Sequence, residues 1–145
     1  MHIHLKPIDK SNYESIIMLE VTETQEEFVA SNMFSLVEAA YDETLTVRGI
    51  YNGDIPVGFL MWKKASDLKI EIWRFMVDKS HQKLGIGRKA MELALSEIKQ
   101  DTQINEIEIC YDPLNPIAKS FYASFGFKEI GLDDEGEEML AVILF

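Results

Sequence analysis

The sequence is poor in cysteine, because Cys110 is the only one in 145 residues. One thiol cannot form a disulfide within the chain, so a cytoplasmic location is the default expectation. The chain also lacks any apolar stretch of the roughly 20 residues that a membrane-spanning helix needs. Its opening stretch, MHIHLKPIDK, contains no apolar run of the kind found in a signal peptide. No membrane partner is therefore expected.

Basic residues are scarce as well. Lysine and arginine together number 14 against 25 acidic residues, which gives a net charge of −11. A nucleic-acid-binding protein needs a basic patch or stripe, and no run of Lys or Arg supplies one, so no nucleic-acid partner is expected. Two explanations of the acidic excess stay open: it can attract a cationic substrate, or it can simply keep the surface soluble.

The composition that remains is ordinary for a globular protein, with 47% hydrophobic and 27% charged residues. No repeat or linker interrupts it, so we expect one domain over residues 1–145. Strands are expected at 2–6, 46–51, 55–62, 70–77, 106–111, 127–132 and 139–145. Helices are expected from Ser11, from Thr24 through 33–41, at 87–98 and at 116–125. Strands interrupted by helices predict an α/β (α+β) fold with one mixed sheet.

Two glycines, Gly85 and Gly87, lie where a polar loop ends and a helical pattern begins. Bare backbone at a helix start suits an anion, because the first N–H groups of a helix have no internal partner. Residues 85–90 also match the dinucleotide-binding pattern G-x-G-x-x-A, with Glu106 downstream. In the dinucleotide fold, however, the glycines directly follow a strand. Here seven mostly polar residues separate Val77 from Gly85, which argues against that interpretation.

Three motifs follow one another in the second half of the chain. The strand WRFMVD at 73–78 precedes the loop QKLGIG at 82–87, and NPIAKSFY follows at 115–122. In this order they resemble the GNAT superfamily of acyl-CoA-dependent N-acetyltransferases, whose pyrophosphate loop reads Q/R-x-x-G-x-G/A and whose later helix carries N-x-x-A-x-x-x-Y. The resemblance covers nearly the whole chain. It implies a mostly antiparallel, twisted sheet of about seven strands with about four flanking helices, splayed between residues 70–77 and 106–111.

The resemblance also implies acetyl-CoA as the acyl-donor substrate. Backbone N–H groups of residues 83–88 would hold the pyrophosphate, and an N–H near Met76 or Val77 would face the thioester oxygen. Asn115 would bond the pantetheine arm, although it also suits a helix N-cap. The basic side chains near the loop have solvated surface as their alternative. The residues expected to contact acetyl-CoA are Phe75, Met76, Val77, Gln82, Lys83, Leu84, Gly85, Ile86, Gly87, Arg88, Asn115, Ala118 and Lys119.

Two residues are candidates for moving protons. Tyr122 follows Asn115 by two helical turns, and resembling enzymes use this tyrosine to protonate the departing thiolate. Its alternative role is aromatic packing in the core. Glu71 is expected on the same strand face as Trp73, Phe75 and Val77, and burial could make it a general base. Glu108 is the alternative base, and an ordinary solvated glutamate is the third reading.

The amine acceptor is expected to be a polyamine such as spermidine or spermine. Residues 25–32, with Ser35 and Leu36 beyond them, resemble the N-terminal part of bacterial spermine/spermidine acetyltransferases. Acceptor binding is assigned to Glu23, Glu26, Glu27 and Trp73. Some polyamine acetyltransferases place a glutamate where Trp73 stands, which leaves the base open. Other acceptors, namely a protein N-terminus, a lysine or an aminoglycoside, also stay open, as does a non-catalytic acyl-CoA-binding module.

No metal is expected, because His2 and His4 have no Cys or carboxylate cluster at metal-ligand spacing. Cys110 has no identifiable activating partner, and it is interpreted as a buried small side chain rather than a nucleophile. The expected partner is therefore a small-molecule amine. The oligomeric state is left open, with a homodimer as one option.

Overall fold

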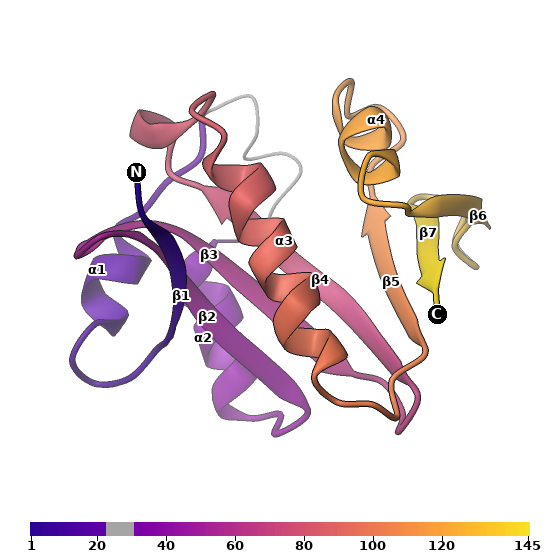
Figure 1. The fold of residues 1–145 in the computed structure, drawn as a ribbon, viewed down its shortest axis with the longest axis horizontal. Coiled ribbons are helices and arrows are strands. Elements are labelled where there is room, and N and C mark those ends of the chain that lie inside the picture. Colours follow the sequence, from indigo (N-terminus) through magenta and orange to yellow (C-terminus); the bar gives the residue numbers. More distant parts are fainter. Residues whose placement is uncertain (23–30) are drawn as a thin grey trace.

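The computed structural model describes residues 1–22 and 31–145, which form one seven-stranded sheet with helices on both faces (Figure 1). This architecture confirms the predicted mixed fold. The strands are β1 (Ile3–Pro7), β2 (Leu45–Asn52), β3 (Ile55–Lys64), β4 (Lys69–Val77), β5 (Glu106–Tyr111), β6 (Lys128–Leu132) and β7 (Met139–Leu144). The helices are α1 (Tyr13–Ile17), α2 (Asn32–Ala40), α3 (Ile86–Lys99) and α4 (Ala118–Ala123), with a 3-10 turn η1 (Lys79–His81).

The strand order is β1-β2-β3-β4-β5-β7-β6. Neighbouring strands are antiparallel except β4 and β5, which run parallel. That parallel pair is short: it begins at Lys69↔Glu106 and ends at Ile72↔Ile109, so the rest of β4 has no partner on β5. Figure 1 shows the two strands diverging toward the end where α3 begins. The predicted splay is confirmed.

Two apolar clusters hold the layers together, one on each face of the sheet. The larger cluster joins α3 to the sheet through residues such as Ala90, Met91 and Ile107, and Tyr122 of α4 packs against it. The smaller cluster, around Ile16 of α1 and Phe59 of β3, lies on the opposite face, where α2 also packs. Burial of these side chains stabilises each layer by roughly 1.5–3 kcal/mol per large residue. The sheet is therefore covered differently on its two faces.

Two predicted helix starts are wrong. The helix expected from Ser11 begins instead at Tyr13, without a side-chain cap, and the Ser11 hydroxyl donates to Asp9 at 2.5 Å. Likewise, α4 begins at Ala118 rather than Pro116. Local side-chain bonds compete with helix formation at both places. The helix start expected at Thr24 lies outside the described residues.

Strand β4 contains a bulge at Trp73. Met61 of β3 pairs with Arg74, whereas Trp62 pairs with Ile72, so Trp73 is the extra residue. An extra residue shifts the alternation of side chains, and every position after it changes face. The bulge therefore decides toward which face of the sheet the side chains of each half of β4 point.

Among residues 1–22 and 31–145, no helix has the length and apolar character needed to cross a membrane.

Candidate active site

A cleft of about 590 Å³ opens where β4 and β5 separate. Its walls come from both sides of the splay and from the start of α3. The lining residues, grouped along the chain, are Val21, Ile72, Trp73, Arg74, Phe75, Met76, Val77, His81, Gln82, Lys83, Gly85, Ile86, Gly87, Arg88, Ile109, Cys110, Tyr111, Asp112, Asn115, Ile117, Ala118, Phe121, Tyr122 and Glu138. The cleft therefore gathers most of the residues that the three motifs predicted.

The glycine loop forms the start of α3 as predicted. Gly85 is the N-cap with φ 82°, a left-handed conformation that glycine adopts without strain, and no side chain caps the helix there. Lys83 also has positive φ, at 64°. The first N–H groups of α3, from Ile86 onward, thus have no intrahelical partner and face an open cleft. The helix dipole adds a partial positive charge at this end, so the position suits a phosphate.

Gly87 is the narrow point of the loop. A Cβ placed there would lie 3.4 Å from the Phe75 ring and 3.7 Å from Val77. A methyl group would still fit at these distances, but a longer side chain would have to enter the cleft. The conformation and the space together let an anion approach the backbone of the loop.

Two of the predicted cofactor residues lie away from the cleft lining. Leu84 is 59% exposed, and Lys119 forms a 3.5 Å ion pair with Glu129. Arg88 does line the cleft, and its guanidinium donates to the Ser124 hydroxyl at 2.8 Å and lies over the Phe125 ring. Asn115 also lines the cleft, and its side-chain oxygen accepts the Ile117 N–H at 3.3 Å.

Tyr122 combines the two roles considered for it from sequence. Its ring stacks on Tyr111 at 5.5 Å and contacts Phe121 and Phe127, so it packs into the aromatic core. Its side chain nevertheless lines the cleft, and its hydroxyl makes no hydrogen bond to any described residue. Burial raises the pKa of Tyr122 above its ordinary value of 10, so the phenol stays protonated at neutral pH.

Glu71 does not share a face with Phe75 and Val77, so that expectation is wrong. Trp73 donates its Nε1–H to Glu71 at 3.3 Å, and Trp73 belongs to the cluster on the α1–α2 face. Phe75 and Val77 pack on the α3 face. The bulge at Trp73 is the cause, because it inverts the alternation between Glu71 and Phe75. The first half of β4 thus places Glu71 and Trp73 on the opposite face of the sheet from Phe75 and Val77.

A four-residue ionic network continues from Glu71 onto β5. Glu71 pairs in register with Glu108, and Lys69 lies 3.8 Å from Glu71, 3.4 Å from Glu108 and 3.3 Å from Glu106. Burial raises the pKa of Glu108, and the Lys69 ammonium only partly offsets it. None of these carboxylates reaches the cleft lining, so any proton exchange with the cleft would need an intervening water.

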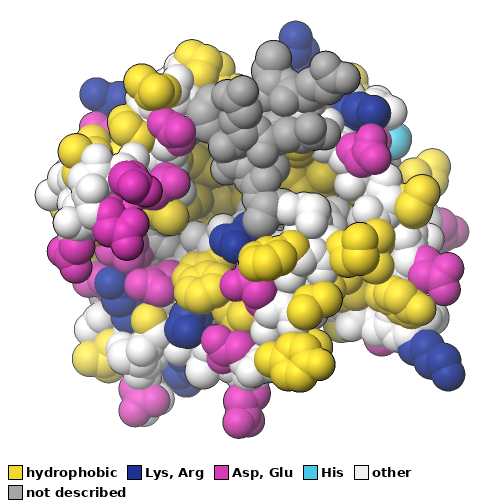
Figure 2. Space-filling model, turned by 180° about the vertical axis from the view of Figure 1, so that it is seen from behind, with side chains coloured by type: hydrophobic (Ala, Val, Ile, Leu, Met, Phe, Trp, Pro, Cys, Tyr) yellow, Lys and Arg dark blue, Asp and Glu magenta, His cyan; other side chains and the backbone are white. Residues whose placement is uncertain are grey.

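Sequence reasoning missed two carboxylates that do line the cleft, Asp112 and Glu138. Neither has a Lys or Arg partner among the described residues, whereas Glu71, Glu106 and Glu108 share Lys69. Burial raises the pKa of Glu138, and Asp112 contributes in the same direction. Figure 2 shows acidic side chains gathering on the left half of that view, on the side of β5 and β7. Only tertiary pairing of β5 with β7 brings the two carboxylates together, and no local motif signals it.

Cys110 is not buried as predicted, because its side chain is exposed and lines the cleft. Alternation along β5 points it away from Ile109 and Tyr111, which pack in the core. The protein surrounding the cleft desolvates the thiol and, with nearby Glu138 and Glu108, raises the Cys110 pKa to about 11. A thiol with this pKa is a poor nucleophile at neutral pH.

Some expectations fall outside the structure described. Glu23, Glu26 and Glu27, assigned to acceptor binding, lie in residues 23–30. Within the described ranges, no group of three or more His, Cys, Asp or Glu side chains is placed to hold a metal ion. Trp73, the fourth residue assigned to the acceptor, lines the cleft.

Comparison with known proteins decides the family. The model of the Acetyltransferase (GNAT) family matches residues 10–127. The chain belongs to the GNAT family of acetyltransferases. The predicted family is thereby confirmed, and acyl transfer from acetyl-CoA is the chemistry that the family supports.

Individual relatives are more distant. A probable spermine N(1)-acetyltransferase of Bacillus subtilis subsp. natto is 27% identical, with 97% of each chain covered. The spermidine N-acetyltransferase of Vibrio cholerae, solved with CoA and spermine, has a TM-score of 0.79 at 17% identity, covering 98% of this chain and 95% of that one. PaiA N-acetyltransferase of Thermoplasma acidophilum, solved with coenzyme A, has a TM-score of 0.74 at 19% identity and covers 100% of both chains. At these identities the solved structures confirm the GNAT-like fold.

Proposed function

We propose that this protein transfers the acetyl group of acetyl-CoA to a primary amine of a polyamine such as spermidine or spermine. The observation that carries the acceptor assignment is the pair Asp112 and Glu138, which face the cleft without a basic partner among the described residues. A cationic chain would supply the missing positive charge. The 27% identical relative named as a probable spermine N(1)-acetyltransferase supports the same acceptor class.

The cofactor half of the reaction depends on backbone. The N–H groups at the start of α3 would hold the pyrophosphate of acetyl-CoA, with the loop around Gly85 and Gly87 giving the close approach that phosphate oxygens need. Beyond Ile72, β4 has no ladder partner on β5. A backbone N–H near Met76 or Val77 is thus available to polarise the thioester carbonyl, a contribution of a few kcal/mol in acyl-transfer enzymes.

The acceptor half depends on side chains. Asp112 and Glu138 would bind ammonium groups, with Trp73 forming the apolar wall against the methylene chain between them. The reacting amine must lose a proton before attack, since an alkylamine has a pKa near 10. Glu71 and Glu108 lie behind Trp73 and would receive that proton through water. The raised pKa of Glu108 brings this carboxylate closer to the range of a useful base.

The amine nitrogen forms a bond to the acetyl carbon while the bond from that carbon to sulfur breaks. The amine proton leaves toward the carboxylates of β4 and β5, and the Tyr122 hydroxyl donates a proton to the departing thiolate. Tyr122 suits this role because its side chain lines the cleft and its phenol is protonated at neutral pH. The products are an N-acetylamine and a free thiol.

A thiol-release assay with a panel of amines tests this proposal. Spermidine and spermine should be acetylated more efficiently than a monoamine, a peptide or an aminoglycoside, and the preference should weaken as salt is added. Activity confined to peptides or aminoglycosides would contradict the acceptor while leaving acetyl transfer in place. Binding of acetyl-CoA with no transfer to any amine would instead indicate a non-catalytic module.

A further inference from the structure

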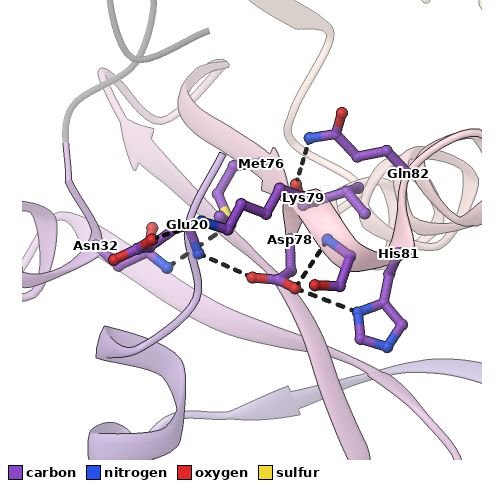
Figure 3. A network of polar contacts seen from close by, with 9 residues as sticks. Glu20, Asn32, Met76, Asp78, Lys79, His81 and Gln82 are labelled. Carbon is purple, nitrogen blue, oxygen red and sulfur yellow. Dashed lines mark hydrogen bonds and ion pairs between the residues drawn. The ribbon is translucent and has the colours of Figure 1, made fainter. Parts of the chain in front are cut away.

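Asp78 lies directly after β4, and its two carboxylate oxygens serve two different segments of the chain (Figure 3). Oδ1 accepts the backbone N–H of Glu20 at 2.9 Å. Oδ2 accepts the backbone N–H of Ser80 at 3.2 Å and lies 3.3 Å from Nδ1 of His81. Glu20 follows α1, whereas Ser80 and His81 belong to η1, which leads into the glycine loop. One side chain thus joins segments about 60 residues apart.

Backbone bonds reinforce this junction. The Lys79 N–H donates to the Glu20 carbonyl at 2.6 Å, and the Asp78 N–H donates to Val57 of β3 at 2.7 Å. The Asp78 side chain is only 13% exposed. Burial alone would raise its pKa, but the hydrogen bonds from Glu20, Ser80 and His81 outweigh burial and lower it. The carboxylate is therefore held in its ionised form by the segments that it joins.

Each of the two segments continues into a wall of the cleft. Val21 follows Glu20 and lines the cleft, and on the other side His81 and Gln82 line it where the glycine loop begins. The Gln82 side-chain amide donates to the Val77 carbonyl at 2.8 Å, so the loop start is also tied to β4. Asp78 itself does not line the cleft. It can influence either substrate only through the residues that it positions.

We propose that Asp78 is a positioning residue that fixes the wall at Val21 and the start of the CoA-binding loop relative to each other. The amine and acetyl-CoA are thereby held in the correct relative position. This inference rests on the proposed function. Its chemical basis is that a carboxylate offers acceptor oxygens to both segments, and an amide does not. In Asp78→Asn, one end of the side chain becomes an NH₂ group, which would face a backbone N–H donor.

The test compares Asp78→Asn with a matched control, Asp9→Asn. Asp9 also accepts a backbone N–H, from Ser11 at 2.8 Å, but its hydrogen bonds stay within one surface loop. The dissociation constant of CoA is measured by calorimetry, and the Michaelis constant is measured for an amine that the wild type acetylates. In Asp78→Asn both constants should rise about 3- to 30-fold with a smaller change in turnover at saturation. Both should stay at wild-type values in Asp9→Asn.

Hydrogen exchange followed by mass spectrometry supplies a readout that needs no activity. Exchange should rise in Asp78→Asn in peptides that contain Glu20 and in those that contain Ser80 and His81, and in neither for Asp9→Asn. A change on only one side would reduce Asp78 to a local cap and overturn the proposal. Unchanged exchange and unchanged constants would also overturn it. An inactive wild type would contradict the proposed function separately, because the exchange result would still decide the role of Asp78.

Discussion

The two halves of the cleft present different groups: one half presents mainly backbone groups and the other presents mainly side chains. The half proposed to bind acetyl-CoA uses backbone: the bare N–H groups at the start of α3, the left-handed Gly85 and the second half of β4, which has no partner on β5. The half proposed to bind the acceptor uses side chains, namely Trp73 of β4, Asp112 directly after β5 and Glu138 directly before β7. A backbone site depends little on side-chain identity, whereas a side-chain site can change with a few substitutions. One fold can therefore keep a donor site while its acceptor site changes.

The largest expected effect comes from a substitution in the glycine loop at the start of α3. Gly87→Glu should weaken acetyl-CoA binding about 1,000-fold, because the new carboxylate would enter the cleft and repel phosphate, and such like-charge contacts cost several kcal/mol. Gly87→Ala is the matched control. Its Cβ would meet Phe75 at 3.4 Å, so it should lose far less affinity. Calorimetric titration with CoA measures the affinity of both variants. Equal affinity in Gly87→Glu and wild type would mean that the loop does not bind CoA.

Tyr122→Phe should lower turnover about 100-fold and leave CoA affinity nearly unchanged, since it removes a proton donor and keeps the ring. Tyr111→Phe is the control in the same aromatic stack. Tyr111 lines the same cleft, but its hydroxyl donates to Glu129, so Tyr111→Phe removes this hydrogen bond. Steady-state rates and CoA titrations compare the two. If Tyr111→Phe and Tyr122→Phe slow the reaction equally, Tyr122 serves packing alone.

Neutralising the acceptor carboxylates should have an intermediate effect. Asp112→Asn and Glu138→Gln should each raise the Michaelis constant for spermidine about 10-fold, with turnover changing less, because they remove charge that binds the cation. Glu97→Gln is the control, since Glu97 is paired with Arg48 outside the cleft lining. Kinetics at two salt concentrations should show the weaker salt dependence only in the cleft variants. An equal rise in the control would indicate a general effect of net charge.

The smallest effect concerns pH. The pKa of Glu138 is raised above its ordinary 4.5, so this carboxylate becomes neutral at a higher pH than an exposed glutamate does. Spermidine keeps its charge over the same range, so its Michaelis constant should rise a few-fold as pH falls from 7 toward 5. In Glu138→Gln the rise should be flatter. A wild-type Michaelis constant that stays level over this range would mean that Glu138 does not bind the cation.

The sequence predicted the two halves unequally, and the reason is physical. The strands and the glycine loop depend on local patterns, namely alternation and helix-start glycines, whereas the splay was implied by the family resemblance that the motif order carries. No local pattern in the sequence indicates the bulge at Trp73. Strict alternation therefore predicts Glu71 and Phe75 on the same face, which is wrong. Asp112 and Glu138 lie close together only because β5 pairs with β7. No sequence motif indicates a contact between residues so far apart in the chain. The burial predicted for Cys110 is wrong because the strand pattern does not reveal the cleft that exposes this side chain.

The relative efficiency of spermidine and a monoamine tests the acceptor assignment most directly. In wild-type protein, kcat/KM for spermidine should exceed that for a monoamine by at least about 10-fold, because two cleft carboxylates bind charge that the monoamine lacks. In the double variant Asp112→Asn with Glu138→Gln, the ratio should fall toward 1 while CoA affinity is unchanged. A wild-type ratio near 1, or a ratio that survives both substitutions, would contradict the assignment of this cleft to a polyamine.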